Sequence, residues 1–207
     1  MGLINGTCSL TRFIAEDPIP EDYLRTFPQL IARYSFKNLD EASDAERSMG
    51  WVNIMDMFNS SFLNMQYLKE PYLAMTWRID TRNVPAKALK QYSIEAEMKV
   101  MEMEGLDFLP KGKKKEIKEM TRLGLLKRAI PVSKTYDMVW NIEKGYVLFG
   151  GANRKLCDEF SSFFHKCFNI RLGSIYPCLT ASRFLENQGK QPQLLEGLNY
   201  SITGAIG

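Results

Sequence analysis

The residues best placed to do chemistry are basic side chains crowded into one short stretch of the sequence. The nine are Lys111, Lys113, Lys114, Lys115, Lys118, Arg122, Lys127, Arg128 and Lys134. Only Glu116 and Glu119 oppose them, so this stretch carries +7 while the rest of a chain of net charge +3 carries −4. A concentrated basic segment on a mildly acidic chain is typical of a protein that binds a polyanion.

Four of these cations fall on one stripe of an expected helix: Lys111, Lys115, Lys118 and Arg122. At 100° per residue they lie within about 60° of one another. Ile117, Met120 and Leu123 centre on the opposite side, so we expect the helix to dock by that side and to present its cations outward. Like charges at i and i+4 destabilise a helix. We interpret the row as a site for phosphates, with a solvated helix face as the alternative.

Base-reading motifs do not accompany the stripe: the sequence has no zinc-finger spacing, no RNP-like aromatic motif and no signature of a short recognition helix. We therefore expect contacts with the nucleic-acid backbone that tolerate any sequence and weaken with salt. If about four phosphates are neutralised per protomer, log K should fall against log salt with a slope near −3.6.

Metal and nuclease chemistry receive weaker support. His165, the single histidine, lies between Cys157 and Cys167, but zinc needs a fourth ligand and closer pairs, so we expect a packing or surface role. Glu97 and Lys99 with Asp80 could be arranged to hold magnesium, although this spacing is common by chance in helices. We expect no catalytic residue, no metal ligand and no cofactor.

The motif Gly150-Gly151-Ala152-Asn153 has two interpretations. Between a strand and a helix its amides could face a phosphate, but a tight turn with Asn153 as helix N-cap is the commoner use.

Membrane insertion and secretion find no support in the sequence. The four cysteines have no paired CxxC spacing and sit among apolar residues, as reduced buried thiols do. No apolar stretch approaches the length of a membrane span, and the first residues lack the pattern of a leader peptide. We expect a cytoplasmic protein with no membrane contact.

Hydrophobic periodicity and turn signals predict an α+β fold: an antiparallel sheet with helices packed on one face and a projecting basic helix pair. A helix from Pro20 contains Pro28, which should kink or divide it. Strands are expected at 3–14, 49–52, 72–80, 135–142, 146–149 and within 168–176, and further helices at 85–105, from 111 to just before 131, at 153–168 and at 178–187. Residues 1–180 should form one domain with a helical insertion at about 85–130, followed by a C-terminal segment, 181–207.

Several short motifs in order resemble a known family. They are Met49-Gly50-Trp51-Val52, Arg78-Ile79-Asp80, Val84-Pro85, the run Leu125-Leu126-Lys127-Arg128-Ala129-Ile130-Pro131, and Trp140 before a glycine-containing hairpin. Together they make residues 1–180 similar to the RdgC family of bacterial recombination-associated proteins.

The resemblance implies a nucleoid-associated protein that binds duplex DNA without sequence preference, forms a ring-shaped homodimer with a positively charged hole and restrains the RecA recombinase. By position, residues 111–122 would be the basic helix and Arg128 the arginine of the family's Leu-Pro-Arg-Ala segment, while Trp51 and Trp140 would be structural.

This sequence departs from the family pattern in three ways. Lys127 replaces a proline, and Asn141-Ile142 replaces Ile-Asp. The chain also stops where a typical member continues for about a third of its length. An open dimer, another oligomer and a monomer therefore stay possible beside the ring.

Three functions follow as hypotheses. The first is a non-enzymatic, sequence-independent binder of double-stranded DNA in recombination or replication. The second is a protein-interaction module that inhibits a host recombination factor and uses its lysines against an acidic protein. The third is a magnesium-dependent nuclease.

Overall fold

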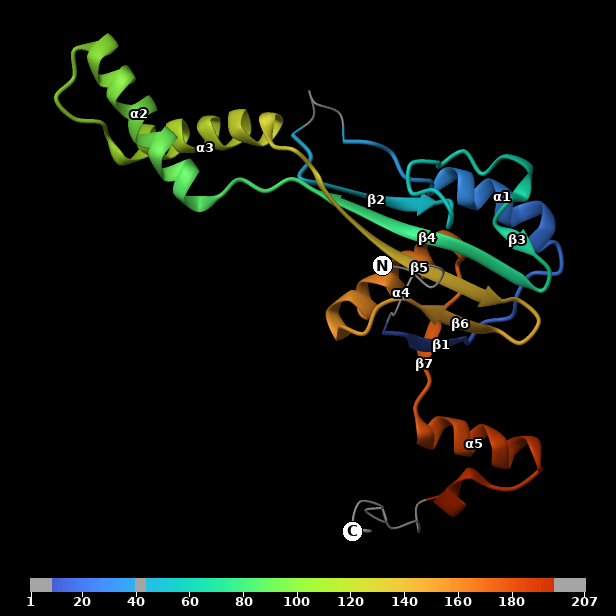
Figure 1. Ribbon diagram of the computed structural model, residues 1–207. Coiled ribbons are helices and arrows are strands. Elements are labelled where there is room, and N and C mark those ends of the chain that lie inside the picture. The colour runs from blue at the N-terminus through green and yellow to red at the C-terminus, as the bar shows by residue number, and fades with distance from the viewer. Residues whose placement is uncertain (1–8, 40–43, 196–207) are drawn as a thin grey trace, which may run out of the picture.

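The computed structural model describes residues 9–39 and 44–195 (Figure 1). In chain order the elements are β1 (Thr11–Ala15), α1 (Tyr23–Arg33), β2 (Arg47–Val52), the 3-10 turn η1 (Leu63–Met65), β3 (Leu68–Lys69), β4 (Tyr72–Thr81), α2 (Ala86–Glu104), α3 (Lys111–Arg128), β5 (Val132–Asn141), β6 (Tyr146–Phe149), α4 (Arg154–Phe168), β7 (Leu172–Ser174), α5 (Pro177–Asn187) and η2 (Pro192–Leu195).

The strands form one sheet in the order β2-β4-β5-β6-β1-β7, with β3 pairing on β4. Each of these strand pairs is antiparallel. The β5–β6 hairpin turns at Gly145, whose φ of 69° suits a residue without a side chain. The predicted α+β class with an antiparallel sheet is confirmed.

The core lies between one face of the sheet and helices α1 and α4. Three tryptophans on neighbouring strands, Trp51, Trp77 and Trp140, are fully buried there, which confirms the structural role expected of two of them. Phe27 of α1 stacks on Trp140, and Phe163 of α4 stacks on Trp77. These helices bury their apolar sides because apolar residues recur along them at helical spacing, Phe27 and Ile31 in α1 and four phenylalanines in α4.

Trp51 is also held by a polar contact within this core. Its indole N–H donates to the Cys167 sulfur at 3.3 Å, and burial raises the pKa of the Cys167 thiol to about 12. Cys167 and Cys157 are free and buried, as expected of reduced thiols, while Cys8 lies outside the described residues.

The outer edge of β2 is covered by the chain that follows α1. The Phe36 N–H donates to the Trp51 carbonyl, and the Trp51 N–H donates to the Tyr34 carbonyl, at 2.9 and 3.0 Å. Gly50 permits this approach, because a Cβ atom there would lie 2.5 Å from the Phe36 backbone. The close approach explains the glycine in the Met49-Gly50-Trp51-Val52 motif.

Helices α2 and α3 leave the sheet together between β4 and β5. Thr81 at the end of β4 pairs with Val132 at the start of β5, so the chain departs and returns at adjacent positions. Figure 1 shows the two helices extending away from the sheet, and the strongest contacts that each makes with another element are with the other helix. We call α2, α3 and their connection, residues 105–110, the helix pair.

Some expected boundaries were wrong. In the described part of the expected strand 3–14, only Thr11 and later residues are extended, and residues 1–8 lie outside the description. Pro28 does not divide its helix, because α1 is continuous from Tyr23 to Arg33.

The motif at 150–153 is a turn that ends in the expected N-cap, since the Leu156 N–H donates to the Asn153 side chain at 3.2 Å.

Candidate nucleic-acid interface

Helix α3 contains most of the basic stretch. Its first turn places lysines at the positive end of the helix dipole, where positive charge is unfavourable. The helix begins after Pro110, and its first turn contains Lys111, Lys113 and Lys114 without an acidic residue. The positive end of the dipole favours anions, so lysines at this end cost stability that an arriving phosphate would offset. Lys127 and Arg128 in the last turn have the favourable polarity.

Three members of the predicted stripe are exposed cations in the outer half of α3. Lys111, Lys115 and Lys118 make no ion pair within the described part of the chain. Lys111 and Lys118 are seven residues apart, which corresponds to about 10 Å along the helix axis. The structure therefore presents a short row of available positive charge on a projecting element.

The fourth member, Arg122, is engaged by carboxylates. Its guanidinium pairs with Glu119 at 2.8 Å and also with Glu46, which lies just before β2. The Arg122 hydrogen bonds hold the pKa of the Glu119 carboxyl below its usual value. Lys127 pairs with Asp44 at 3.3 Å in the same neighbourhood. These contacts tie the inner half of α3 to the segment just before β2, whereas the three lysines without ion pairs lie in the outer half.

The other predicted residues divide in the same way. Lys113 pairs with Glu104 at 2.5 Å and Lys114 with Glu97 at 3.6 Å, which joins α3 to α2. Arg128 and Lys134 are exposed near the base of the helix pair and, in residues 9–39 and 44–195, have no ion pair. Five of the nine predicted cations are thus unpaired in the described structure, and four are structural contacts.

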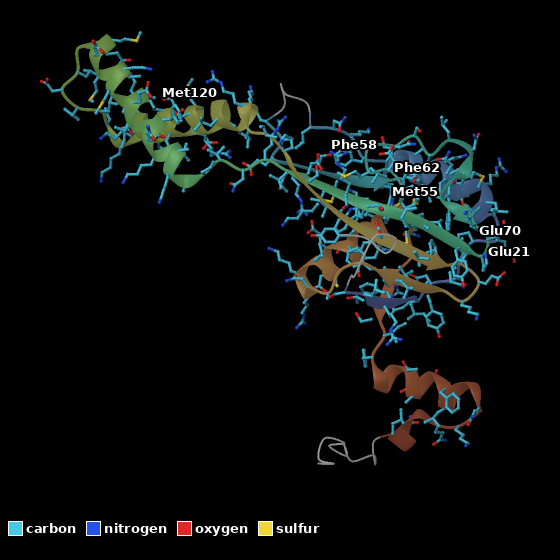
Figure 2. All side chains as sticks on the ribbon, in the orientation of Figure 1. Glu21, Met55, Phe58, Phe62, Glu70 and Met120 are labelled. Atoms are coloured by element: carbon cyan, nitrogen blue, oxygen red, sulfur yellow. The ribbon has the colours of Figure 1, made fainter. Side chains whose placement is uncertain are left out.

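The expected docking side of α3 needs correction. Ile117 is buried, but Met120, expected beside it, is 68 % exposed (Figure 2). The reason is that α2 is the main neighbour of α3 and covers a narrow strip of its surface. Met120 lies about 60° around the helix from Ile117 and falls outside that strip.

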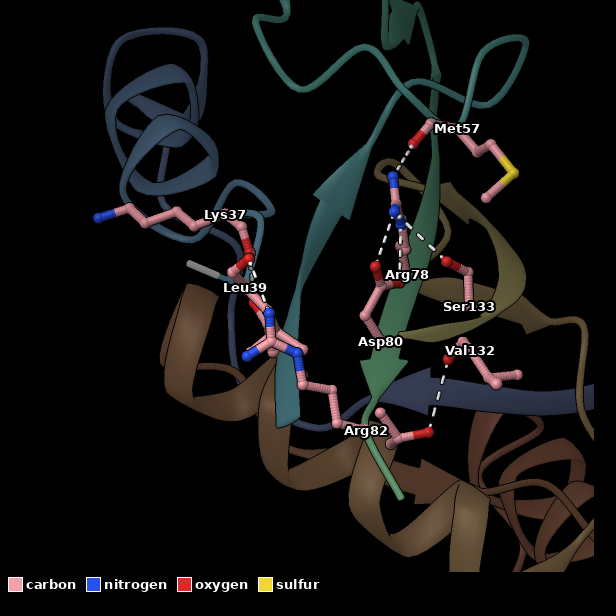
Figure 3. Close-up of polar contacts among 10 residues, drawn as sticks. Lys37, Leu39, Met57, Arg78, Asp80, Arg82, Val132 and Ser133 are labelled. Atoms are coloured by element: carbon pink, nitrogen blue, oxygen red, sulfur yellow. Dashed lines mark hydrogen bonds and ion pairs between the residues drawn. The ribbon is translucent and has the colours of Figure 1, made fainter. Parts of the chain in front are cut away.

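Arg78 and Asp80 of the Arg78-Ile79-Asp80 motif form a buried ion pair (Figure 3). They alternate with Trp77 and Ile79 along β4, so the pair lies on the face of the sheet opposite the tryptophans. The Arg78 guanidinium donates to both Asp80 oxygens, at 2.8 and 2.7 Å, and to the Met57 carbonyl at 3.1 Å. Its carbon lies 4.2 Å from the centre of the Phe36 ring. Arg78 therefore fastens the loop after β2 onto β4, and Asp80 is committed to holding it.

The nuclease pattern weighed from the sequence has other partners in the structure. Asp80 binds Arg78, Glu97 pairs with Lys114, and Lys99 pairs with Glu95. His165 is an exposed residue of α4. Among the described residues, no three His, Cys, Asp or Glu side chains are grouped to hold a metal ion.

Sequence reasoning missed the exposed apolar residues near the connection of the helix pair. Met103 is 86 % exposed and Phe108 is 74 % exposed. The signal was present, because a connection reading Gly-Leu-Asp-Phe-Leu-Pro is unusually apolar for a loop between two polar helices.

Comparison with known proteins identifies a family for this chain. A family model described as "RdgC: Putative exonuclease, RdgC" matches residues 19–181, a span that includes α1, the helix pair, the tryptophan core and α4. No curated protein matches the chain. No described helix is long and apolar enough to cross a membrane.

Proposed function

Because the chain belongs to the RdgC family, we propose that it binds double-stranded DNA without sequence preference and acts in recombination or replication. The exposed row Lys111, Lys115 and Lys118 is the phosphate-contacting element of this proposal. In the same proposal the protein is not an enzyme, works in the cytoplasm on the nucleoid, and acts as a homodimer that restrains a recombinase.

One observation carries the proposal: three lysines of one helix face are exposed and form no ion pair in the described structure. Lys115 acts on Glu119, one turn further along α3, only through its electrostatic field, which adds to the larger effect of Arg122 in lowering the pKa of that carboxyl. The row from Lys111 to Lys118 is roughly 10 Å long and exposes three cations on one side of α3. The phosphates of one strand follow one another along the edge of a duplex, so a row of this kind can contact neighbouring phosphates of a single strand.

The pairing of Arg122 changes the expected salt dependence. With three phosphates rather than four neutralised per protomer, log K should fall against log salt with a slope of about −2.7. Arg128 and Lys134 near the base of the pair would make the slope steeper if the DNA reaches them.

The test is a salt-titrated binding assay with duplex DNA, single-stranded DNA and RNA. The triple variant Lys111→Gln, Lys115→Gln, Lys118→Gln should bind at least about tenfold more weakly than the wild type and flatten the slope toward zero. The matched control replaces three exposed lysines that lie outside the helix pair, Lys144, Lys155 and Lys166, by Gln. It makes the same change in net charge and should preserve most of the slope.

Two outcomes would contradict the proposal. If both triple variants weaken binding equally, the helix is not the binding element, and net charge alone governs affinity. If the wild type binds no nucleic acid but binds an acidic protein through the same lysines, the protein-interaction hypothesis replaces it.

The family description "Putative exonuclease" favours a second candidate, a nuclease. Incubating the wild-type protein with end-labelled duplex and magnesium or manganese tests it directly. Shortening of the labelled strand that Glu97→Gln abolishes would establish the nuclease and overturn the non-enzymatic proposal.

A further inference from the structure

The outer end of the helix pair exposes apolar side chains on a part of the protein that points away from the sheet (Figure 1). Met103 of the last turn of α2, together with Leu106 and Phe108 of the connection, is exposed. We call Met103 and Phe108 the tip residues. Large exposed apolar side chains gathered at one place mark a contact surface more often than a solvated one.

The connection has a defined conformation that turns Phe108 outward. Gly105 adopts a φ of 64°, and its N–H and that of Leu106 both donate to the Met101 carbonyl, which caps α2. Leu109 is 4 % exposed, so the neighbour of Phe108 is the buried residue of the connection. Phe108 is therefore exposed beside an anchored residue.

An ion pair strengthens the same end. Lys113 at the start of α3 binds Glu104 at the end of α2, with contacts of 2.5 and 2.6 Å to its two oxygens. The two helix ends are joined across the connection, so the tip residues are carried on a braced support. Lys113 therefore joins the two helices, unlike Lys111, Lys115 and Lys118, which form no ion pair in the described structure.

We propose that the tip residues form an apolar wedge that contacts unstacked bases of the DNA bound along α3, and that the protein prefers duplexes with an easily opened base step. This inference rests on the proposed function. Lys111 follows Phe108 by three residues, so the lysine row begins beside the wedge. A duplex held by that row would bring its bases within reach of the tip.

The chemistry of the tip suits bases of any sequence. An aromatic ring stacks on the face of every base, and an apolar side chain placed between base steps opens them without reading hydrogen-bond donors or acceptors. Opening a step costs least where pairing is already incomplete. A gap in one strand should therefore improve binding through the tip residues, while the lysine contacts to phosphate stay the same.

The experiment compares two duplexes of identical sequence, one continuous and one with a central single-nucleotide gap, for wild type and two double variants. We expect the wild type to prefer the gapped duplex. Met103→Ser with Phe108→Ser should weaken its binding to the gapped duplex by about fivefold or more, and to the continuous duplex by less. The matched control, Tyr92→Ser with Met120→Ser, removes two exposed apolar residues of the same helix pair away from the tip and should keep the preference.

A spectroscopic readout identifies the contact itself. With 2-aminopurine opposite the gap, binding of the wild type should change the fluorescence, Phe108→Ser should remove most of that change, and Phe108→Tyr should restore it. The wedge is overturned if the wild type binds both duplexes equally, or if the preference survives loss of the tip residues. Loss of the preference in the control variant would also overturn it. Failure to bind either duplex would instead defeat the proposed function on which the wedge depends.

Discussion

The sheet together with helices α1 and α4, which we call the sheet domain, buries its large apolar side chains, whereas the helix pair exposes many of its own. In the domain, large apolar side chains are enclosed: Trp51, Trp77 and Trp140 are buried under the phenylalanines of α1 and α4. In the pair, the described buried residues are few and mostly small or medium in size: Ser93, Leu109, Ile117 and Leu126. Much of the apolar surface there faces outward. The difference indicates that the domain supplies the stability and the pair supplies the contact surface.

The two regions also use their ion pairs differently. The Arg78–Asp80 ion pair is buried under the loop after β2, where the Arg78 guanidinium binds Asp80 and the Met57 carbonyl in place of water. The pairs Lys113–Glu104 and Arg122–Glu46 lie near the surface and orient helices. Exposed ion pairs contribute little to stability, so the ion pairs of the helix pair act mainly by positioning its helices.

The contrast is tested most strongly by truncating one side chain in each region. Trp51→Ala should lower the free energy of unfolding by about 3–5 kcal/mol, because it leaves a cavity and removes the hydrogen bond to Cys167. Met120→Ala should change it by less than about 0.5 kcal/mol. Urea denaturation followed by circular dichroism measures both, and similar losses in the two variants would contradict the division.

The buried ion pair offers the next largest effect. Asp80→Asn should destabilise the domain by about 3 kcal/mol, because it leaves the Arg78 guanidinium buried without a charge partner. The double variant Arg78→Met, Asp80→Asn should lose less than the sum of the two single changes. A thermodynamic cycle from urea titrations checks this, and additive losses would show that the two residues act independently.

Removing the helix pair should have a smaller effect on folding. Since Thr81 and Val132 are partners, replacing residues 83–131 by Gly-Gly closes β4 and β5 with a short hairpin loop. The shorter loop favours folding by about 2 kcal/mol, which offsets lost contacts such as those of Leu126. We expect cooperative thermal unfolding together with loss of DNA binding. A shortened chain that fails to fold would show that the domain depends on the pair.

The smallest predicted effect concerns acid stability at the edge of the domain. Hydrogen bonds from Arg171 lower the pKa of the exposed Asp17 carboxyl to about 2. Because this pKa is depressed in the folded state, the contribution is present above pH about 4 and is lost as the pH falls toward 2. Asp17→Asn should flatten the pH dependence of the unfolding free energy in that window, and an unchanged profile would refute the assignment.

The sequence supports prediction of the sheet domain because its patterns are local. Phenylalanine spacing identifies α4, Asn153 marks its start, and Gly145 marks the β5–β6 turn. Charge alone also located the basic helix. The cations of α3 could not be sorted in this way, because the partners of Arg122 and Lys113, Glu46 and Glu104, come from other segments that only the fold brings near.

The prediction of buried apolar residues in the helix pair was wrong for a related reason. Met120, Ile94 and Met98 have the spacing of a buried face, yet all three are exposed. A helical repeat shows which residues share a side but not whether a neighbour covers that side. Two helices that pack mainly on each other cover only part of their surfaces, so periodicity overstates what they bury.

The covered edge at Gly50 has a consequence for how copies of the protein meet. Residues 34–36 occupy backbone groups that β2 would otherwise offer to a foreign strand, and β7 at the opposite margin of the sheet is only three residues long. Short or capped margins discourage fibril-like growth through main-chain pairing. Assembly into larger particles would then use side-chain surfaces, which single substitutions can tune without disturbing the sheet itself.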